Sequence, residues 1–363
     1  MEVLNTELFD NSYPIVITDD FYELRNFLAD KTANIVIISD TNVGKIYYNN
    51  LNEVIDRHCE KILYYEIPAG EENKSVTELK NIYHFLIESK INRTDIIVGL
   101  GGGVIGDLVG FVAATYLRGI RLIHIPTSFL SQVDSSIGGK TAINMMNVKN
   151  VVGAFYQPTL VYINYSVLDS LPLEERTNGF VEMMVHAIIK DEELFEILEK
   201  NVDKIINLDK CILSEVIKKN CIIKKNIIEA DEKETGERVI LNFGHTFGHA
   251  IESNYNYQYK HGECVASGIL GACYIGESIN ILDKRITERI YNVLKKLHVF
   301  QDLSKCKWEN VYQYMQHDKK WISNQIQFII PTAIGRVICY KVQDINLIKH
   351  AFERMKMIPK NLV

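Results

Sequence analysis

The order of apolar runs and helical patterns constrains the fold of this chain more than any other feature of its sequence. In roughly the first 165 residues, short β-branched runs alternate with helical patterns. Such alternation predicts a parallel sheet with helices on both faces. The predicted strands are Tyr13–Thr18, Asn34–Ser39, Lys61–Ile67, Asp95–Leu100 and Arg121–Ile125, and the predicted helices lie near residues 20–29, 43–57, 74–89 and 104–116.

Strand signals nearly vanish after about residue 172, and long amphipathic patterns replace them. The exceptions are Gln325–Ile330 and Arg336–Cys339, which are predicted to pair as a small ribbon. The stretch Leu171-Pro-Leu-Glu-Glu, with a proline and acids opening a helix, predicts a boundary. The length of 363 residues suits two domains, expected at 1–171 and 172–363, with an active-site cleft between them.

Composition excludes several functional classes. A net charge of −6 argues against a nucleic-acid binder and against a protein that binds anionic membranes. No run of about 18 apolar residues predicts a membrane span, and the first residues, Met1-Glu-Val-Leu-Asn-Thr-Glu7, do not resemble a signal peptide. Seven cysteines without a CxxC pair predict free thiols in a reducing compartment, so we expect a cytoplasmic protein.

Glu182 is a charged residue inside an apolar helical run, flanked by Val181, Met183, Met184 and Val185. An unpaired carboxylate there would cost several kcal/mol or shift its pKa until it became neutral. Coordination of a cation removes that cost. The sequence therefore marks Glu182 as a candidate metal ligand.

Histidines follow in two motifs, Asn242-Phe-Gly-His-Thr-Phe-Gly-His249 and His261-Gly-Glu263. His245 and His249 are four residues apart and share one face of a helix, a common geometry for a metal or phosphate site. Histidine pairs of this spacing also occur in helices without a ligand. Together with Glu182 and His261, they favour Zn²⁺ or a similar divalent ion such as Co²⁺, with an open position for substrate.

A glycine-rich turn, Gly101-x-Gly103-x-x-Gly106, lies between a predicted strand and a predicted helix. Glycines there let backbone N–H groups approach a pyrophosphate at the helix N-terminus. The turn follows the fourth predicted strand rather than the first, and Asp40 ends an earlier strand. We expect a dinucleotide site in a sheet unlike the usual six-stranded dehydrogenase form, while a turn without a ligand remains the alternative.

Basic residues accompany turn-forming residues instead of scattering over solvated faces. Lys140 follows two glycines in a predicted loop, Lys149 and Asn150 come soon after, and Arg118 precedes a glycine. Lys224 lies on an apolar helical stripe, where a surface lysine is not expected. Each alone is more often a solvated charge. Several in one cleft would suit a small substrate with both a phosphate and a carboxylate.

These segments together resemble the 3-dehydroquinate synthases within the sugar-phosphate cyclase family, over nearly the whole chain. The most specific parts are Gly101–Asp107, Pro126-Thr-Ser128, Asp134–Lys140 with Asn144, Lys149–Gln157, Asn242–His249 and His261-Gly-Glu263. The resemblance implies a homodimer with an α/β N-terminal domain, which binds NAD through a parallel sheet and a Gly-rich nucleotide-binding turn. A mainly α-helical, metal-binding C-terminal domain would follow.

The resemblance also implies roles for individual residues. The metal ligands map onto Glu182, His245 and His261, and His249 becomes a contact of the substrate phosphate. Residues that match positions for the substrate carboxylate and hydroxyls are Lys140, Lys224, Arg238 and Asn242. Residues that match the phosphate-binding and catalytic surroundings are Asp134, Lys149, Asn150, His249 and one of Lys319 or Lys320. Arg118 matches an arginine that reaches the neighbouring active site in the dimer.

NAD contacts follow from the same match. Gly102 and Gly103 would cradle the phosphates, Asp40 would meet a ribose or a group on the nicotinamide side, and Glu71 and Lys74 resemble the adenosine-binding stretch. The other expected contacts are Asn42, Val104, Asp107, Thr127, Ser128, Asp134, Lys140 and Lys149.

One position departs from the family pattern. Family members usually carry lysine three residues after the metal glutamate, and this chain has Val185. Three residues along a helix is the same face, so an ammonium group expected near the substrate is missing.

The implied activity converts 3-deoxy-D-arabino-heptulosonate 7-phosphate into 3-dehydroquinate and phosphate, with NAD oxidised and regenerated within the cycle. The alternatives are another cyclase of the inosose or valiolone type, a metal-dependent alcohol dehydrogenase, and a paralogue with low or no turnover because of Val185.

Overall fold

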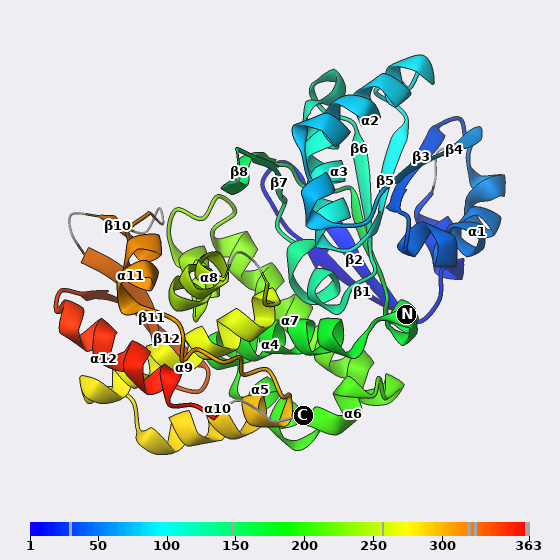
Figure 1. Cartoon of the computed structure of the whole chain (residues 1–363). Helices are drawn as coiled ribbons and strands as arrows, with labels where there is room; N and C mark the ends of the chain where they lie inside the picture. Colours follow the sequence, from blue (N-terminus) through cyan, green and yellow to red (C-terminus); the bar gives the residue numbers. More distant parts are fainter. Residues whose placement is uncertain (29–30, 147, 256–257, 318–320, 323–324, 360–363) are drawn as a thin grey trace. The chain divides into compact units, whose positions relative to one another are not determined.

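The computed structural model describes residues 1–28, 31–146, 148–255, 258–317, 321–322 and 325–359 (Figure 1). The chain divides into two compact units. The first comprises Met1–Leu171 and Leu213–Lys233, and the second comprises Pro172–Ile212 and Glu234–Val363. Residues 213–233 therefore belong to the first unit although they follow residue 171 in the sequence.

The first unit is built around a seven-stranded sheet in the order β1-β2-β9-β6-β5-β3-β4. All pairs in it are parallel except β1 with β2. Its strands are β1 Glu2–Thr6, β2 Tyr13–Thr18, β3 Asn34–Asp40, β4 Lys61–Ile67, β5 Ile96–Gly101, β6 Arg121–Pro126 and β9 Leu160–Asn164. A separate antiparallel hairpin pairs β7 Lys140–Met145 with β8 Val148–Phe155.

The helices of this unit are α1 Val43–Ile55, α2 Val76–Glu88, α3 Gly103–Thr115 and most of α7 Lys210–Ala230. Short helical segments are η1 Tyr22–Phe27, η2 Asp56–His58, η3 Glu71–Asn73, η4 Tyr116–Arg118, η5 Ser131–Ser135 and η6 Tyr165–Ser170. All five predicted strands are confirmed to within one residue at each end. The α-helix predicted near 20–29 is wrong, because residues 20–28, the described part of that range, form only the short 3₁₀ segment η1.

Alternate side chains of the parallel strands build two cores. Val36 and Ile38 of β3 pack with α2 and α3, whereas Ile35 and Ile37 pack with α1. Helices therefore cover both faces of the sheet, as predicted (Figure 1). β3 leads into α1 on one face and β5 leads into α3 on the other, while β3 and β5 are neighbours. This is a topological switch point, where parallel sheets leave a crevice at the carboxyl ends of their strands.

The second unit is mainly helical. Its elements are α4 Leu173–Lys190, α5 Glu192–Lys200, α6 Val202–Ile206, η7 Glu237–Asn242, α8 His245–Asn254, α9 His261–Ser278, α10 Lys284–Lys296, α11 Trp308–His317, α12 Ile345–Lys356 and the strands β10 Trp321–Ile322, β11 Gln325–Ala333 and β12 Arg336–Val342. β11 and β12 pair antiparallel, which confirms the predicted ribbon. One core joins α8, α9, α11 and α12 to this ribbon. Among the described helices, none has the length and apolar character needed to cross a bilayer.

Candidate functional site

In the first unit, most residues predicted to bind NAD lie after the carboxyl ends of the parallel strands. Asp40 ends β3, Gly102 follows β5, and Thr127 and Ser128 follow β6. A Cβ added at Gly102 would lie 3.4 Å from the Ser128 Oγ, so these two strand ends are close. Gly102 is the N-cap of α3, whose first backbone N–H groups have no partner in the preceding turn. The arrangement provides a helix N-terminus suited to an anion at the switch point.

Lys74 and Asp107 form an ion pair at this edge of the sheet. The Lys74 Nζ lies 3.0 Å from the Asp107 Oδ2 and 3.3 Å from the Glu71 Oε1. Burial opposes the charge on Lys74, but Asp107 and Glu71 outweigh it and raise the pKa of the lysine. Glu71 also accepts a hydrogen bond from the Asn144 Nδ2 at 2.8 Å. The structure thus joins Glu71 and Lys74, three residues apart, to Asp107, which lies 33 residues after Lys74.

The basic residues that the sequence singled out in the first unit lie on strands and a short helix. Lys140 begins β7 and Lys149 lies in β8, so the prediction of a loop at Lys140 is wrong. Directly after Gly138 and Gly139 the backbone becomes a strand, because it pairs with β8. The two glycines alone did not indicate this pairing. The Asn150 backbone N–H donates to the Asn144 Oδ1 at 3.0 Å, while Arg118 is exposed in η4.

Lys224 lies on the buried stripe of α7, as predicted, and is only 4% exposed. Its Nζ donates to the Asp134 backbone oxygen at 2.6 Å and forms an ion pair with the Asp134 carboxylate. One turn earlier on α7, the Asn220 Nδ2 donates to the Val133 oxygen at 2.6 Å. These contacts fix the Asp134 segment against α7 and explain how a lysine is tolerated on an apolar face.

In the second unit, Glu182, His245 and His261 come together from three helices, α4, α8 and α9. The Nε2 atoms of His245 and His261 are 3.3 Å apart, and the Glu182 Oε2 lies 3.8 Å from the His245 Nε2. Glu182 is 4% exposed, which confirms its predicted burial. Corners of a tetrahedron about 2.05 Å from a central Zn²⁺ are separated by about 3.3 Å. The spacing of the two nitrogens therefore fits a divalent ion. One ring nitrogen from each of His245, His249 and His261 lies within 4.8 Å of the others, and the Glu182 carboxylate beside His245 offers an oxygen donor.

Both imidazoles turn Nε2 toward the proposed metal position, because each Nδ1 has a partner elsewhere. The His245 Nδ1 lies 2.9 Å from the Phe243 backbone oxygen, and the His261 Nδ1 lies 3.2 Å from the Glu252 Oε2. An acceptor at Nδ1 places the proton there and leaves the Nε2 lone pair for a metal. His249 also lies close, with its ring centroid 5.2 Å from that of His245. Its role as ligand or phosphate contact stays a prediction.

Two residues near the site were missed by the sequence reasoning. The Asn178 Oδ1, one turn before Glu182 on α4, accepts a hydrogen bond from the Gly262 backbone N–H at 2.5 Å. Asn178 thereby ties the start of α9, and with it His261, to the helix that carries Glu182. The second missed residue is Glu252, seven positions after His245 on α8. The helical spacing of Asn178 from Glu182 was an available signal, whereas only the fold brings Glu252 to His261.

Arg238 and Asn242 lie in η7, just before α8. Arg238 is 1% exposed, and the Asn242 Nδ2 donates to the Glu234 Oε1 at 3.0 Å. Asn242 is therefore held by a contact close in sequence to His245, and Arg238 is buried. Lys319 and Lys320 lie outside the described residues.

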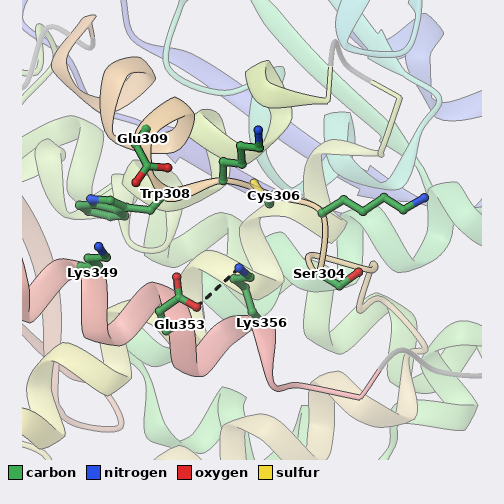
Figure 2. Close-up of a pocket in the computed structure, with 9 residues that line it drawn as sticks. Ser304, Cys306, Trp308, Glu309, Lys349, Glu353 and Lys356 are labelled. Carbon is green, nitrogen blue, oxygen red and sulfur yellow. Dashed lines mark ion pairs between the residues drawn. The ribbon is translucent and has the colours of Figure 1, made fainter.

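A cavity of about 520 Å³ in the second unit has none of these predicted residues in its lining, which Figure 2 shows. It is lined by Ser304–Glu309 and by Lys349, Glu353 and Lys356, which share one face of α12. Within the described part of the chain, Lys356 pairs with Glu353 at 3.5 Å, whereas Lys349 is exposed to solvent. None of the described donor groups that could hold a metal ion lines this cavity, so the histidine cluster is the better candidate site.

Close packing of α8 on α9 brings His245 and His261 together. A Cβ on Gly268 would lie 1.9 Å from the Gly244 backbone oxygen, and one on Gly248 would lie 3.1 Å from the Val265 Cα. Gly244 itself adopts a φ of +77°, which disfavours other residues. The glycines of the histidine motif therefore serve the approach of the two helices.

Gly268→Ala is expected to force these helices apart. Alanine in a helix normally gains about 1 kcal/mol over glycine, but overpacking against a backbone atom costs about 1–3 kcal/mol or more. We expect a net loss of unfolding free energy, measured by urea denaturation, and weaker metal binding. Gly106→Ala in α3 is the matched control, because its nearest neighbour would be His124 at 4.0 Å. Equal stability of the two variants would contradict this account.

Comparison with known proteins decides the family. The sequence pattern described as 3-dehydroquinate synthase N-terminal matches residues 64–178, and the one described as 3-dehydroquinate synthase C-terminal matches residues 179–321. The chain belongs to the 3-dehydroquinate synthase family. It is 42% identical to the 3-dehydroquinate synthase of Acetivibrio thermocellus over 349 residues, which cover 95% of this chain and 97% of the relative.

Solved structures of sugar-phosphate cyclases share the fold. A 2-deoxy-scyllo-inosose synthase complexed with carbaglucose-6-phosphate, NAD⁺ and Co²⁺ superposes with a TM-score of 0.89 at 24% identity, covering 97% of this chain and all of that chain. A 2-epi-5-epi-valiolone synthase from Streptomyces hygroscopicus with NAD⁺ and Zn²⁺ bound gives 0.88 at 22% identity, covering 96% and 98%. The predicted fold class is confirmed for this member of the dehydroquinate synthase family.

Proposed function

We propose that this chain is an active 3-dehydroquinate synthase of the shikimate pathway, acting in aromatic amino acid biosynthesis as a phosphate-eliminating lyase in the cytoplasm. It would convert 3-deoxy-D-arabino-heptulosonate 7-phosphate to 3-dehydroquinate and phosphate. The observation that carries this is the 42% identity to a 3-dehydroquinate synthase along 95% of the chain. The inosose and valiolone synthases share the fold at 24% identity or less.

The cofactors would be NAD in the first unit and Zn²⁺ or Co²⁺ in the second. The solved cyclases hold NAD⁺ with Co²⁺ or Zn²⁺, and the donor set of Glu182, His245 and His261 suits such an ion. When bound, NAD supplies a reversible hydride acceptor, and the metal lowers the pKa of a hydroxyl that it binds. Asp40, Gly102 and Ser128 would orient NAD at the carboxyl edge of the sheet, together with Asn42, Glu71, Lys74, Gly103, Val104, Asp107 and Thr127.

The remaining site residues would bind the substrate. Lys140, Lys224, Arg238 and Asn242 would hold its carboxylate and hydroxyls, since fixed cations and an amide suit those groups. Lys149, Asn150, His249 and one of Lys319 or Lys320 would hold the phosphate as it leaves, and Asp134 would keep Lys224 in place. Holding both ends of the ring-opened intermediate would favour the intramolecular aldol closure, because proximity lowers the barrier of such a step by several kcal/mol.

We also propose a homodimer in which Arg118 reaches the neighbouring active site. Arg118 is exposed in η4, next to Leu117, which is 40% exposed. The β7–β8 hairpin of the same unit exposes further apolar side chains, Met145, Met146, Val148, Val151 and Phe155. Exposed apolar groups of this number are typical of an interface. Sedimentation of the full chain tests this, and a monomer at micromolar concentration would exclude it.

Phosphate release from the heptulosonate phosphate, with and without added NAD⁺ and Zn²⁺, tests the activity. Release should require both and should proceed without a lasting rise in NADH absorbance. Stoichiometric accumulation of NADH would favour an alcohol dehydrogenase. Faster turnover of a sugar phosphate without a carboxylate would favour another cyclase.

Val185→Lys tests the one departure from the family pattern. Val185 is fully buried on α4, one turn after Glu182. Loss of a charged donor from a desolvated site typically costs about 1.5–3 kcal/mol, or roughly 10- to 100-fold in rate. If Val185 is a lost donor, the variant should raise kcat/KM by about that factor. Val185→Met, which fills the space without a charge, is the control, and a lysine variant no faster than the parent would exclude the lost-donor account.

A further inference from the structure

We propose that Glu252 is a positioning residue for the metal centre. Its carboxylate accepts a hydrogen bond from the Nδ1–H of His261 and holds that imidazole with Nε2 turned toward the metal. The inference rests on the proposed assignment of Glu182, His245 and His261 as ligands.

Two distances place the His261 imidazole between the Glu252 carboxylate and the proposed metal position. The Glu252 Oε2 lies 3.2 Å from the His261 Nδ1, and the His261 Nε2 lies 3.3 Å from the His245 Nε2. A neutral imidazole carries its proton on one nitrogen and its lone pair on the other. A carboxylate at Nδ1 therefore selects the tautomer whose Nε2 can bind a cation.

The position of Glu252 on α8 makes this contact possible. It follows His245 by seven residues and His249 by three, so all three lie on one face of the helix. The Glu252 side chain is 10% exposed, a degree of burial that is costly for a carboxylate without hydrogen bonds. The contact with His261 answers that requirement. A glutamate that only solvates a helix surface points into water, whereas Glu252 is buried against His261.

The two histidines are oriented by different means. The partner of the His245 Nδ1 is the backbone oxygen of Phe243, 2.9 Å away, whereas His261 depends on a charged side chain. A carboxylate raises the basicity of an imidazole ligand. It also supplies a second negative charge, so Glu182 and Glu252 together would balance a divalent ion. His261 is therefore the ligand whose strength a side-chain substitution can change.

The experiment compares Glu252→Ala and Glu252→Gln with the unsubstituted full chain. Metal affinity is measured by competition with a chelator, using Zn²⁺ and Co²⁺, and the visible absorption of bound Co²⁺ reports the ligand geometry. Loss of an outer carboxylate partner typically weakens metal affinity 10- to 100-fold. We expect a loss of that size for Glu252→Ala with an altered Co²⁺ spectrum. Glu252→Gln should recover part of the loss, because its amide oxygen still accepts from Nδ1–H.

Glu277→Gln is the matched control. Glu277 lies on α9, the helix that begins with His261, is 12% exposed and pairs with Arg354 at 2.6 Å. This substitution removes a similarly buried carboxylate far along the helix, and metal affinity should not change. Equal losses in Glu277→Gln and Glu252→Ala would overturn the inference, since they would show only general destabilisation.

Further outcomes are equally decisive. Unchanged metal affinity and an unchanged Co²⁺ spectrum in Glu252→Gln and Glu252→Ala would overturn the positioning role while leaving the ligand assignment intact. Should Glu252→Ala fail to fold, the glutamine variant alone decides, because it retains the size of the side chain. An unsubstituted chain that bound neither Zn²⁺ nor Co²⁺ would overturn the ligand assignment and this inference with it.

Discussion

Glu182→Gln is expected to abolish tight metal binding and to lower kcat/KM for the heptulosonate phosphate by at least about 10³-fold. Glu182 supplies the one carboxylate among the three proposed ligands, and it is buried on α4. An amide keeps the shape but brings no negative charge to offset the cation. A metal acting as a Lewis acid contributes several kcal/mol to a transition state, and about 4 kcal/mol corresponds to 10³-fold in rate.

The measurement is metal content after dialysis, followed by turnover across a range of added Zn²⁺. Excess metal should restore only a small part of the activity, because two histidines without the carboxylate bind a divalent ion weakly. Glu277→Gln again serves as the control, since its carboxylate pairs with Arg354 instead. Full metal occupancy and parental turnover in Glu182→Gln would exclude Glu182 as a ligand.

Protein contacts orient the proposed metal site. The His245 and His261 rings are held by Phe243 and Glu252, and α9 is tied to α4 through Asn178. Each contact fixes a ring or a helix on which the proposed ligand set depends.

Local signals in the sequence predicted much of this architecture. The β-branched runs predicted β2–β6 because they are short, apolar and bounded by turn residues. Burial of Glu182 followed from its apolar neighbours, and burial of Lys224 followed from its place on a helical stripe. Each of these predictions depends on residues within about one or two helical turns, where side-chain periodicity is informative.

Other features depended on contacts that no local pattern contains. The placement of β5 between β3 and β6 creates the switch point, but strand order is set by pairing between distant segments. Lys140 was assigned to a loop because two glycines precede it, and pairing with β8 overrides that signal. Glu252 went unnoticed because a glutamate in a helix is usually solvated, and only the fold places His261 beside it.

Lys224→Met is expected to lower both stability and activity. Lys224 is 4% exposed, and its ammonium contacts the backbone oxygen and the carboxylate of Asp134. Breaking a fully buried ion pair costs about 3–5 kcal/mol. The Asp134 side chain is 27% exposed, so water offsets part of the loss, and we expect about 2–3 kcal/mol. Methionine fills most of the lysine volume, which keeps the packing of α7 intact.

Activity should fall further than the loss of folded protein explains. If Lys224 holds the substrate carboxylate, removing that charged donor lowers kcat/KM by about 10- to 100-fold. Lys225→Met is the matched control. Lys225 is the next residue of α7, and its ion pair with Glu229, at 2.8 Å, is partly exposed. This control should lose less than about 1 kcal/mol and keep its turnover.

A substrate change distinguishes binding from structural support. Replacing the substrate carboxylate with a neutral amide should weaken binding to the parent enzyme but change little in Lys224→Met, because the interacting group is already absent. Such a thermodynamic cycle isolates the contact between the lysine and the carboxylate from the role of Lys224 beside Asp134. An equal penalty for the amide in both proteins would show that Lys224 supports Asp134 without touching the substrate carboxylate, and the proposed carboxylate site would then have to rest on Lys140 and Arg238.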